Sequence, residues 1–454
     1  MATALCLVLS CFLPIVHSET GNGFTLPCTI NTTGNAWDGE LAFDLEGNTE
    51  QGITQQGNYL MVIDTNGTVL AMRESTGSYG AAYNIAPDTL LFQGEPQDGL
   101  TNSAPTYATH IWNFATNTTE DFPNVIGHHD IQYDPINNTF LTLQDYVRQV
   151  GNNSILFDKI VLLSENGTVL WSWDTYNYIP LSEATPYNET TIYNGQTLED
   201  FTHANDLDWD YNDGVIFLNL RYTNTFYEIN QTTGNIIWAC GEFGNFTLLG
   251  ANGQPLVGAN GLPPSLWYGS HDIKEVAPDV FTMFNNDFDN NTNPDDCHSE
   301  MLELTLNETS MTAYVSWSWE APTQYWTSYG GATLLLPNGD FIGDFGDPIH
   351  QFAQNSENGA WNFNDTGAVF VEVNPAGQVV RTWTFPVGWY VYRIEEVTNS
   401  NISPSPTPSV SPSSTPSVST NSQIIIAGAA LVLVVVAVLV LAVVIYRRKK
   451  NQHI

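Results

Sequence analysis

The sequence predicts an all-β protein, a six-bladed β-propeller ectodomain with a C-terminal single transmembrane helix, and two repeating units predict the propeller. The first unit is an Asx-Gly or Gly turn followed by alternating apolar residues, as in TNGTVLAM (65–72), ENGTVLWSWD (165–174), TTGNIIWACG (232–241) and PAGQVVRTWTF (375–385). The second unit is an apolar strand after a Pro or Asx turn, as in DPINNTFLTL, DYNDGVIFLNL, APDVFTMF and LPNGDFIGDF. Strand–turn–strand units that recur along one chain are typical of propellers.

The length of the folded part sets the expected number of blades. At about 60 residues for each repeating unit, the chain before residue 398 would form six blades. Seven smaller blades, or two stacked β-sandwiches, would fit the same pattern.

The two ends of the chain predict an exported, membrane-anchored protein. Residues 1–18 hold no acidic residue and carry a mostly apolar run before Ser18, which is typical of a signal peptide. Residues 424–446 are uncharged and almost wholly aliphatic, and a helix of that length spans the hydrocarbon core of a bilayer. The basic residues that begin the tail at 447–454 place that tail in the cytoplasm.

These ends leave residues 19–398 as the ectodomain and 399–423 as a Ser/Thr/Pro-rich stalk. We expect a single-pass type I membrane protein whose ectodomain is extracellular or lumenal, with the plasma membrane as the expected location. Many of its sequons should carry N-glycans. The sequons include Asn31, Asn66, Asn117, Asn137, Asn152, Asn166, Asn188, Asn230, Asn245, Asn307, Asn364 and Asn401.

The charge balance of the chain excludes some partners. With 48 acidic and 11 basic residues the net charge is −37, which repels nucleic acid and anionic membrane surfaces. The ectodomain bases are Arg73, Arg148, Lys159, Arg221, Lys274, Arg381 and Arg393. Of the cysteines that remain after signal removal, we expect Cys240 and Cys297 to form a disulfide and Cys28 to stay reduced.

Three ectodomain histidines begin similar segments: GHHDIQYDP (127–135), THANDLDWD (202–210) and GSHDIKEVAP (269–278). If the blades repeat with these spacings, His129, His203 and His271 occupy corresponding places, and such places converge on the central channel of a propeller. Three imidazoles there could be metal ligands, acid–base groups or a nucleophile. Alternatively, the His-Asp pairs could satisfy buried strand ends.

Arg221 favours one of these interpretations. It follows His203 in the same segment, at the end of the strand VIFLNLR. A guanidinium is a rigid fork for a tetrahedral oxyanion such as sulfate or phosphate, whereas a metal site would not favour a cation beside it. The sequence therefore predicts an oxyanion-transfer pocket with no metal and no cofactor.

The strings HANDLDWDYNDGVIFLNLRYTNTFYEIN, GHHDIQYD and GSHDIKEV resemble the arylsulfate sulfotransferases, or arylsulfotransferases, between about Asn58 and Val371. The resemblance implies a six-bladed propeller enzyme that uses no nucleotide. Such an enzyme moves a sulfuryl group from an aryl sulfate donor to a phenolic acceptor through a sulfohistidine.

The resemblance also implies roles for single residues. His271 would be the nucleophile, His203 and Arg221 would bind the sulfuryl oxygens, and His129 or its neighbour His128 would act on the phenolic oxygen. The candidate substrate-binding residues are Asn205, Trp267, Tyr268 and Trp326, although the aromatic ones could instead be propeller core. The competing hypothesis is a non-catalytic, glycosylated surface propeller for ligand binding or adhesion.

Overall fold

The computed structural model describes residues 24–47, 57–75, 79–96, 107–183, 185, 190–193, 195–258, 263–288, 297–346 and 366–398. The predicted signal peptide, stalk, transmembrane helix and tail lie outside these ranges. In the described ranges, no helix has the length and apolar character needed to cross a membrane. The helical elements there are 3-10 turns, namely η1 (Thr175–Asn177), η2 (Leu181–Glu183), η3 (Arg221–Thr223) and η5 (Thr323–Tyr325).

The described strands form five hydrogen-bonded sheets. The first contains β2 (Glu40–Gly47), β3 (Asn58–Asp64), β4 (Val69–Ser75), β27 (Trp389–Tyr390) and β28 (Ile394–Val397). A nine-stranded sheet contains β5 (Tyr79–Ala86), β6 (Thr89–Pro96), β7 (Tyr107–Asn113), β8 (Thr118–Asp134), β9 (Thr139–Val150), β10 (Asn153–Ser164), β11 (Val169–Asp174), β12 (Thr190–Tyr193) and β13 (Gln196–Asp200).

Three smaller sheets follow. One consists of β14 (Ala204–Asp210), β15 (Val215–Leu220), β16 (Thr225–Asn230) and β17 (Ile236–Gly241). The next consists of β18 (Thr247–Leu249), β19 (His271–Ala277), β20 (Val280–Asn285), β21 (Glu300–Asn307) and β22 (Thr312–Glu320). The last consists of β1 (Thr29–Thr32), β23 (Ala332–Leu335), β24 (Phe341–Phe345), β25 (Thr366–Val373) and β26 (Val379–Pro386).

Both repeating units of the sequence are antiparallel hairpins. The Asx-Gly units join β3 to β4, β10 to β11, β16 to β17 and β25 to β26. The glycine of each turn has a positive φ, between 70° and 84°, a conformation in which a side chain would be strained. The second unit joins β8 to β9, β14 to β15, β19 to β20 and β23 to β24.

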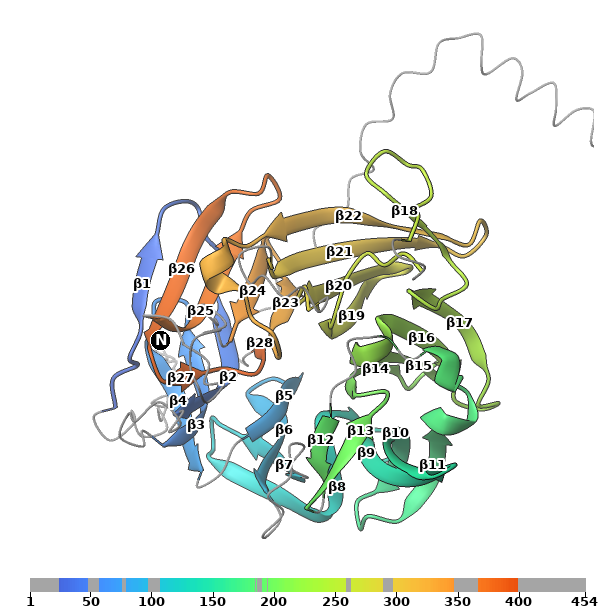
Figure 1. Cartoon of the computed structure of the whole chain (residues 1–454). Helices are drawn as coiled ribbons and strands as arrows, with labels where there is room; N and C mark the ends of the chain where they lie inside the picture. The colour runs from blue at the N-terminus through green and yellow to red at the C-terminus, as the bar shows by residue number, and fades with distance from the viewer. Residues whose placement is uncertain are drawn as a thin grey trace, which may run out of the picture. The chain divides into compact units, whose positions relative to one another are not determined.

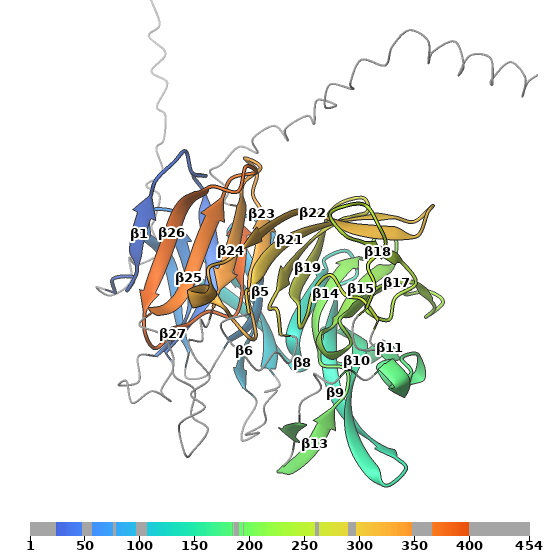
Figure 2. The ribbon, with the colours of Figure 1, turned by 45° about the horizontal axis from the view of Figure 1, so that its top comes forward.

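The sheets stand around a common centre, as Figures 1 and 2 show. The innermost strands contact one another in the order β5, β8, β14, β19, β23 and β28, and β28 contacts β5 again. Segments from the two ends of the folded part close this ring, because β1 pairs with β26 while β27 and β28 pair with β2. The all-β, propeller-like prediction is confirmed, whereas the number of six blades stays a prediction.

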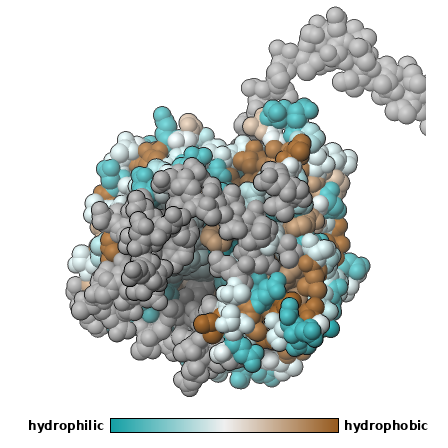
Figure 3. Space-filling view, viewed as in Figure 1, coloured by the Kyte–Doolittle hydropathy of each residue, from teal (hydrophilic) through white to brown (hydrophobic). Residues whose placement is uncertain are grey.

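Apolar cores fill the spaces between neighbouring sheets. Phe43 of β2 packs edge-on against Phe370 of β25 with their ring centroids 5.1 Å apart. Phe217 of β15 packs in the same way against Phe281 of β20 at 5.0 Å. On the face shown in Figure 3, hydrophobic and hydrophilic residues of the described part are interspersed. Apolar side chains that are buried between neighbouring sheets therefore stabilise the ring.

The aspartates of the three histidine segments link each inner strand to the next. Each carboxylate accepts a backbone N–H of the neighbouring sheet: Asp130 from Leu207 at 2.8 Å, Asp206 from Ile273 at 2.5 Å and Asp272 from Thr333 at 2.9 Å. These bonds satisfy amides that would otherwise be buried without a partner. The aspartates therefore link neighbouring sheets through amides that lie within β14, β19 and β23, and the interpretation that His-Asp pairs satisfy strand ends stays untested.

The expected disulfide does not form. Cys240 is a free thiol in the cluster between β15 and β20, and Cys297 belongs to a separate cluster with Trp326. Two cysteines in different clusters cannot meet the short Cβ–Cβ distance that a disulfide needs. Burial also raises the pKa of the Cys28 thiol, to about 12, which disfavours its reactive thiolate.

Candidate active site

The structure brings His129, His203, Arg221 and His271 together at the centre of the ring. The rings of His129 and His203 lie 5.1 Å apart, and His203 lies 4.8 Å from the ring of Tyr222. The Arg221 guanidinium lies 5.1 Å from that same tyrosine ring. The roles of these residues in catalysis stay predictions, but their predicted proximity is a property of the fold.

Irregularities in the strands aim these side chains. Pairing shifts register next to His128 in β8, next to Ala204 in β14 and next to His271 in β19. His129 and His203 have positive φ values of 59° and 45°, which a regular strand does not contain. Such bulges re-aim side chains beside functional sites.

The predicted register of the three histidines is correct for two of them. The aspartates that link the sheets are equivalent, and His129 and His271 each stand one residue before theirs. Before Asp206 the equivalent position is Asn205, and His203 lies two residues earlier, outside the strand. His203 reaches the centre from the segment that connects β13 to β14.

His271 is held as one neutral tautomer. Its Nδ1 lies 2.7 Å from Oδ1 of Asn286, whose Nδ2 donates to the carbonyls of Thr327 and Gly330, each at 2.9 Å. Because Asn286 presents its oxygen, Nδ1 of His271 must carry the proton. The Nε2 lone pair then accepts the Gly330 N–H at 3.2 Å. Burial, together with the charge of Arg221, holds the pKa of His271 well below its ordinary value.

We expect the Asn286→Ala variant to lose both functions of this amide. The carbonyls of Thr327 and Gly330 would lose their donor, and the free energy of unfolding should fall by about 1–3 kcal/mol. The tautomer of His271 would then be held by the Gly330 N–H alone, so the Nε2–H tautomer should gain population, which nitrogen-15 NMR of the imidazole would detect. A variant whose His271 keeps the Nδ1–H tautomer would contradict this assignment.

Arg221 is a buried guanidinium without an acidic partner. Its Nη2 donates to the Ser328 carbonyl at 2.8 Å and its Nη1 to the Tyr222 hydroxyl at 3.3 Å, while Nε has no partner. No ion pair joins Arg221 to a carboxylate in the described part of the chain. Since a buried charge is costly unless it is paired, the site is suited to an anion.

The two adjacent histidines of β8 have different surroundings. His129 faces His203, whereas the His128 ring extends toward Asp145 and Asp158. Burial lowers the pKa of His128, but these two carboxylates outweigh burial and raise it to about 10. Burial and the neighbouring histidines hold the pKa of His129 well below its ordinary value. The Nδ1–H of His128 therefore donates to Nδ1 of His129 at 2.5 Å, and His129 carries its own proton on Nε2.

Of the four predicted substrate-binding residues, three are buried among other protein groups. Both amide atoms of Asn205 are engaged within the protein, with Asn219 at 2.8 Å and the Ser270 carbonyl at 2.7 Å. Trp267 is fully buried in the core between β15 and β20. Trp326 is also buried, and its indole N–H donates to the Asn286 carbonyl at 2.8 Å. Tyr268 is half-buried, and a role for it with substrate stays a prediction.

Sequence reasoning missed two residues near the C-terminal end of the fold. The ring of Tyr392 lies 6.2 Å from both His129 and His271, and its buried hydroxyl has no partner in the ranges that the structure describes. Arg393 lies 3.1 Å from Asp130, 2.9 Å from Asp206 and 3.7 Å from Asp272, at the point where the linking aspartates meet. The rarity of ectodomain bases was the only signal that pointed to Arg393.

Fold and site together define an all-β, propeller-like protein with three histidines at its centre and an arginine that forms no ion pair in the described part of the chain. The chain belongs to the arylsulfotransferase (ASST) family, whose sequence model matches residues 40–393. Membership supports aryl sulfotransferase activity in general, with an aryl sulfate donor and a phenol acceptor. No protein of curated function matches the chain.

Solved structures resemble the chain only loosely. The periplasmic gluconolactonase PpgL of Pseudomonas aeruginosa matches with a TM-score of 0.42 and 12% identity over 79% of this chain and 99% of that one. A putative 6-phosphogluconolactonase of Bacteroides uniformis matches with a TM-score of 0.36 and 11% identity over 79% and 99%. A luciferin-regenerating enzyme matches with a TM-score of 0.38 and 8% identity over 82% and 99%. Likenesses at this level carry no argument about the function of this chain.

Proposed function

We propose that this chain transfers a sulfuryl group from an aryl sulfate to a phenol through a sulfohistidine at His271, without a nucleotide donor. The observation that carries the proposal is the tautomer of His271, whose Nε2 lone pair lies on the side away from Asn286. A neutral imidazole is a competent nucleophile, and a covalent intermediate divides one difficult displacement into two.

In the first step, the hydrogen bond from the Gly330 N–H to Nε2 of His271 opens, Nε2 attacks the sulfur, and the bond between the sulfur and the aryl oxygen breaks. The leaving oxygen takes the proton from Nε2 of His129, while the proton shared with His128 moves to Nδ1 of His129, so the His129 ring stays neutral. In the second step, the acceptor oxygen attacks the sulfur, the bond between Nε2 and sulfur breaks, and the acceptor proton returns along the same path.

The sulfuryl oxygens need donors that act before and during the transfer. Arg221 supplies a guanidinium with an unused Nε–H. The Nδ1–H of His203 donates to Asp200 at 2.6 Å, so its Nε2 can donate to a sulfuryl oxygen in the imidazolium form. Donors that are already oriented stabilise the charge that develops on the sulfuryl and phenolic oxygens. The Tyr392 hydroxyl, which has no partner among the described residues, can supply a further hydrogen bond.

We also propose the setting that the sequence predicts. The signal peptide, stalk and transmembrane helix would place a six-bladed, N-glycosylated ectodomain on the outer face of the plasma membrane. A catalyst outside the cytoplasm has no supply of cytosolic nucleotide sulfate, and sulfohistidine chemistry needs none.

Turnover of 4-nitrophenyl sulfate by the purified full-length protein tests this function. We expect nitrophenol release that requires an added phenol and proceeds without any nucleotide sulfate. In the absence of a phenol, one equivalent of sulfuryl group should stay on the protein and map to His271. Nitrophenol release at the same rate with and without an added phenol would indicate hydrolysis. A folded protein that releases no nitrophenol from any of a panel of aryl sulfates would instead favour a surface propeller that binds ligands.

A further inference from the structure

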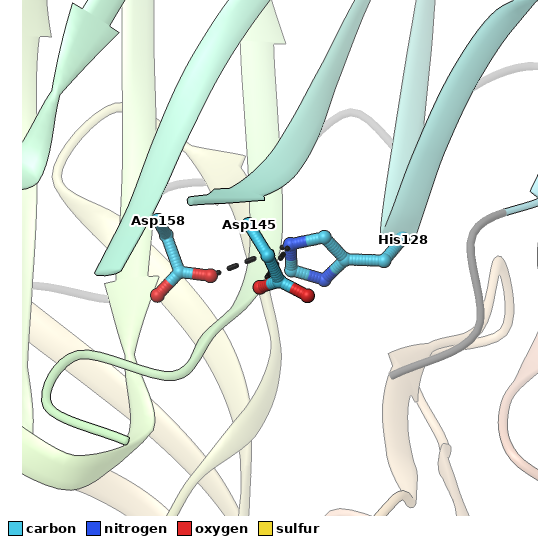
Figure 4. Close-up of side chains that lie close together, drawn as sticks. All are labelled: His128, Asp145 and Asp158. Carbon is cyan, nitrogen blue, oxygen red and sulfur yellow. Dashed lines mark ion pairs between the residues drawn. The ribbon is translucent and has the colours of Figure 1, made fainter. Parts of the chain in front are cut away.

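A second cluster of ionisable side chains lies behind the site, on three neighbouring strands of the nine-stranded sheet. His128 comes from β8, Asp145 from β9 and Asp158 from β10, and Figure 4 shows the imidazole edge turned toward both carboxylates. One ligand atom from each residue lies within 4.8 Å of the others. Of these residues, the proposed sulfuryl transfer uses only His128, and that through its Nδ1.

The two carboxylates are in a costly arrangement. Asp145 and Asp158 are directly opposite each other in the pairing of β9 with β10, and their side chains are only 5% and 3% exposed. Like charges at directly opposed positions destabilise a sheet, and burial increases that cost. Within the described ranges, neither carboxylate forms an ion pair with a lysine or an arginine, so His128 is the only group of basic character that faces them.

Nε2 of His128 lies close to an oxygen of each carboxylate. It lies 3.1 Å from Asp145 Oδ1 and 3.4 Å from Asp158 Oδ1, yet its N–H direction makes a hydrogen bond with neither oxygen. With metal–ligand bonds of about 2.1 Å, atoms at such separations subtend about 95–110° at the ion, between octahedral and tetrahedral angles. Oδ2 of Asp145 is also buried without a partner and is available as a further ligand atom.

The surrounding protein fixes the orientation of these groups. Oδ2 of Asp158 accepts the Thr202 hydroxyl at 2.5 Å and the Ala204 N–H at 2.8 Å, which leaves Oδ1 turned toward His128. On the other side, Nδ1 of His128 is engaged with His129. Metal-binding imidazoles and carboxylates are characteristically held by such outer hydrogen bonds, which set the tautomer and the direction of the lone pair.

We propose that His128, Asp145 and Asp158 bind one divalent transition-metal ion, such as Zn²⁺ or Mn²⁺. One imidazole and two carboxylates suit these ions, whereas Ca²⁺ and Mg²⁺ prefer all-oxygen ligands. The ion would compensate the opposed carboxylates and would displace the Nε2 proton of His128 to solvent. The Nδ1–H of His128 would remain, so the hydrogen bond to His129 would persist. The prediction of no metal concerns the three central histidines beside Arg221. His128, Asp145 and Asp158 are not among those histidines.

Metal binding can be measured on the full-length protein without any sulfate substrate. The protein in detergent is treated with a chelator, loaded with Zn²⁺ or Mn²⁺ alone, separated from free ion and analysed by mass spectrometry for metal content. We expect about one ion per chain, and X-ray absorption at the zinc edge should show one imidazole nitrogen and carboxylate oxygens at about 2.0–2.2 Å. Retention of no ion by the folded protein would overturn the proposal.

Two variants separate this site from adventitious binding by an acidic surface. Asp145→Asn keeps the shape of the side chain and should weaken binding by at least about tenfold. Asp121→Asn removes the carboxylate that lies 2.7 Å from His110. This histidine pairs with one acid instead of two, so the variant should leave metal binding unchanged. Equal metal content in the wild type and both variants would overturn the proposal, as would a zinc spectrum without a nitrogen ligand. Thermal unfolding of each variant confirms that it is folded, and activity does not enter the readout.

Discussion

Replacement of His271 by asparagine should lower acceptor-dependent nitrophenol release by at least about 10³-fold, because it removes the nucleophile that forms the covalent intermediate. The asparagine amide can still contact Asn286, so the pocket should keep its shape. The loss should appear in kcat, with little change in the dissociation constant of a non-reactive aryl sulfonate. This pattern would distinguish lost chemistry from lost binding.

His110→Asn is the matched control for this variant. His110 is also buried and also has its Nδ1 engaged, 2.7 Å from Asp121, but it lies in β7 and takes no part in the cluster of central histidines. We expect it to retain the activity of the wild type. A folded His271→Asn protein that keeps more than about a tenth of the wild-type rate would contradict the covalent mechanism.

The local structure of this protein could be predicted from sequence because local residues determine it. The Asx-Gly units predict hairpins, and the structure has them, with Gly67, Gly167, Gly234 and Gly377 at positive φ. In all four turns a side chain before the glycine also accepts a backbone N–H of the turn, as where Asp64 accepts the N–H of Thr68 at 2.7 Å. Such short-range chemistry can be recognised without knowledge of the fold.

The parts of the site that sequence reasoning missed depend on contacts between distant residues. Arg393 meets Asp130 across 263 positions of the chain, and no local pattern marks such a pair. Asn286 lies only 15 positions after His271, but its role depends on the carbonyls of Thr327 and Gly330 from another segment. His203 lies two residues before the position that corresponds to His129 and His271, and the repeating pattern has no signal for that shift.

Replacement of Arg393 by methionine should lower the free energy of unfolding by about 3–5 kcal/mol, the usual cost of removing one partner of a buried ionic network. Its guanidinium faces Asp130, Asp206 and Asp272 and also bonds to the Asn205 carbonyl at 3.1 Å, so its loss would leave buried carboxylates uncompensated. Arg148→Met, at an exposed position in β9, is the control and should cost less than about 1 kcal/mol.

The effect of Arg393→Met should also depend on pH. Burial raises the pKa of Asp206 and of Asp344 well above the ordinary range, while Arg393 lowers both. A carboxyl whose pKa is raised in the folded state favours folding at low pH and loses that contribution as the pH rises through the folded pKa. Without Arg393 these pKa values rise further, so the stability difference between variant and wild type should be larger at pH 8 than at pH 5. Urea unfolding at the two pH values measures it, and equal differences would show that the aspartates carry no charge that Arg393 compensates.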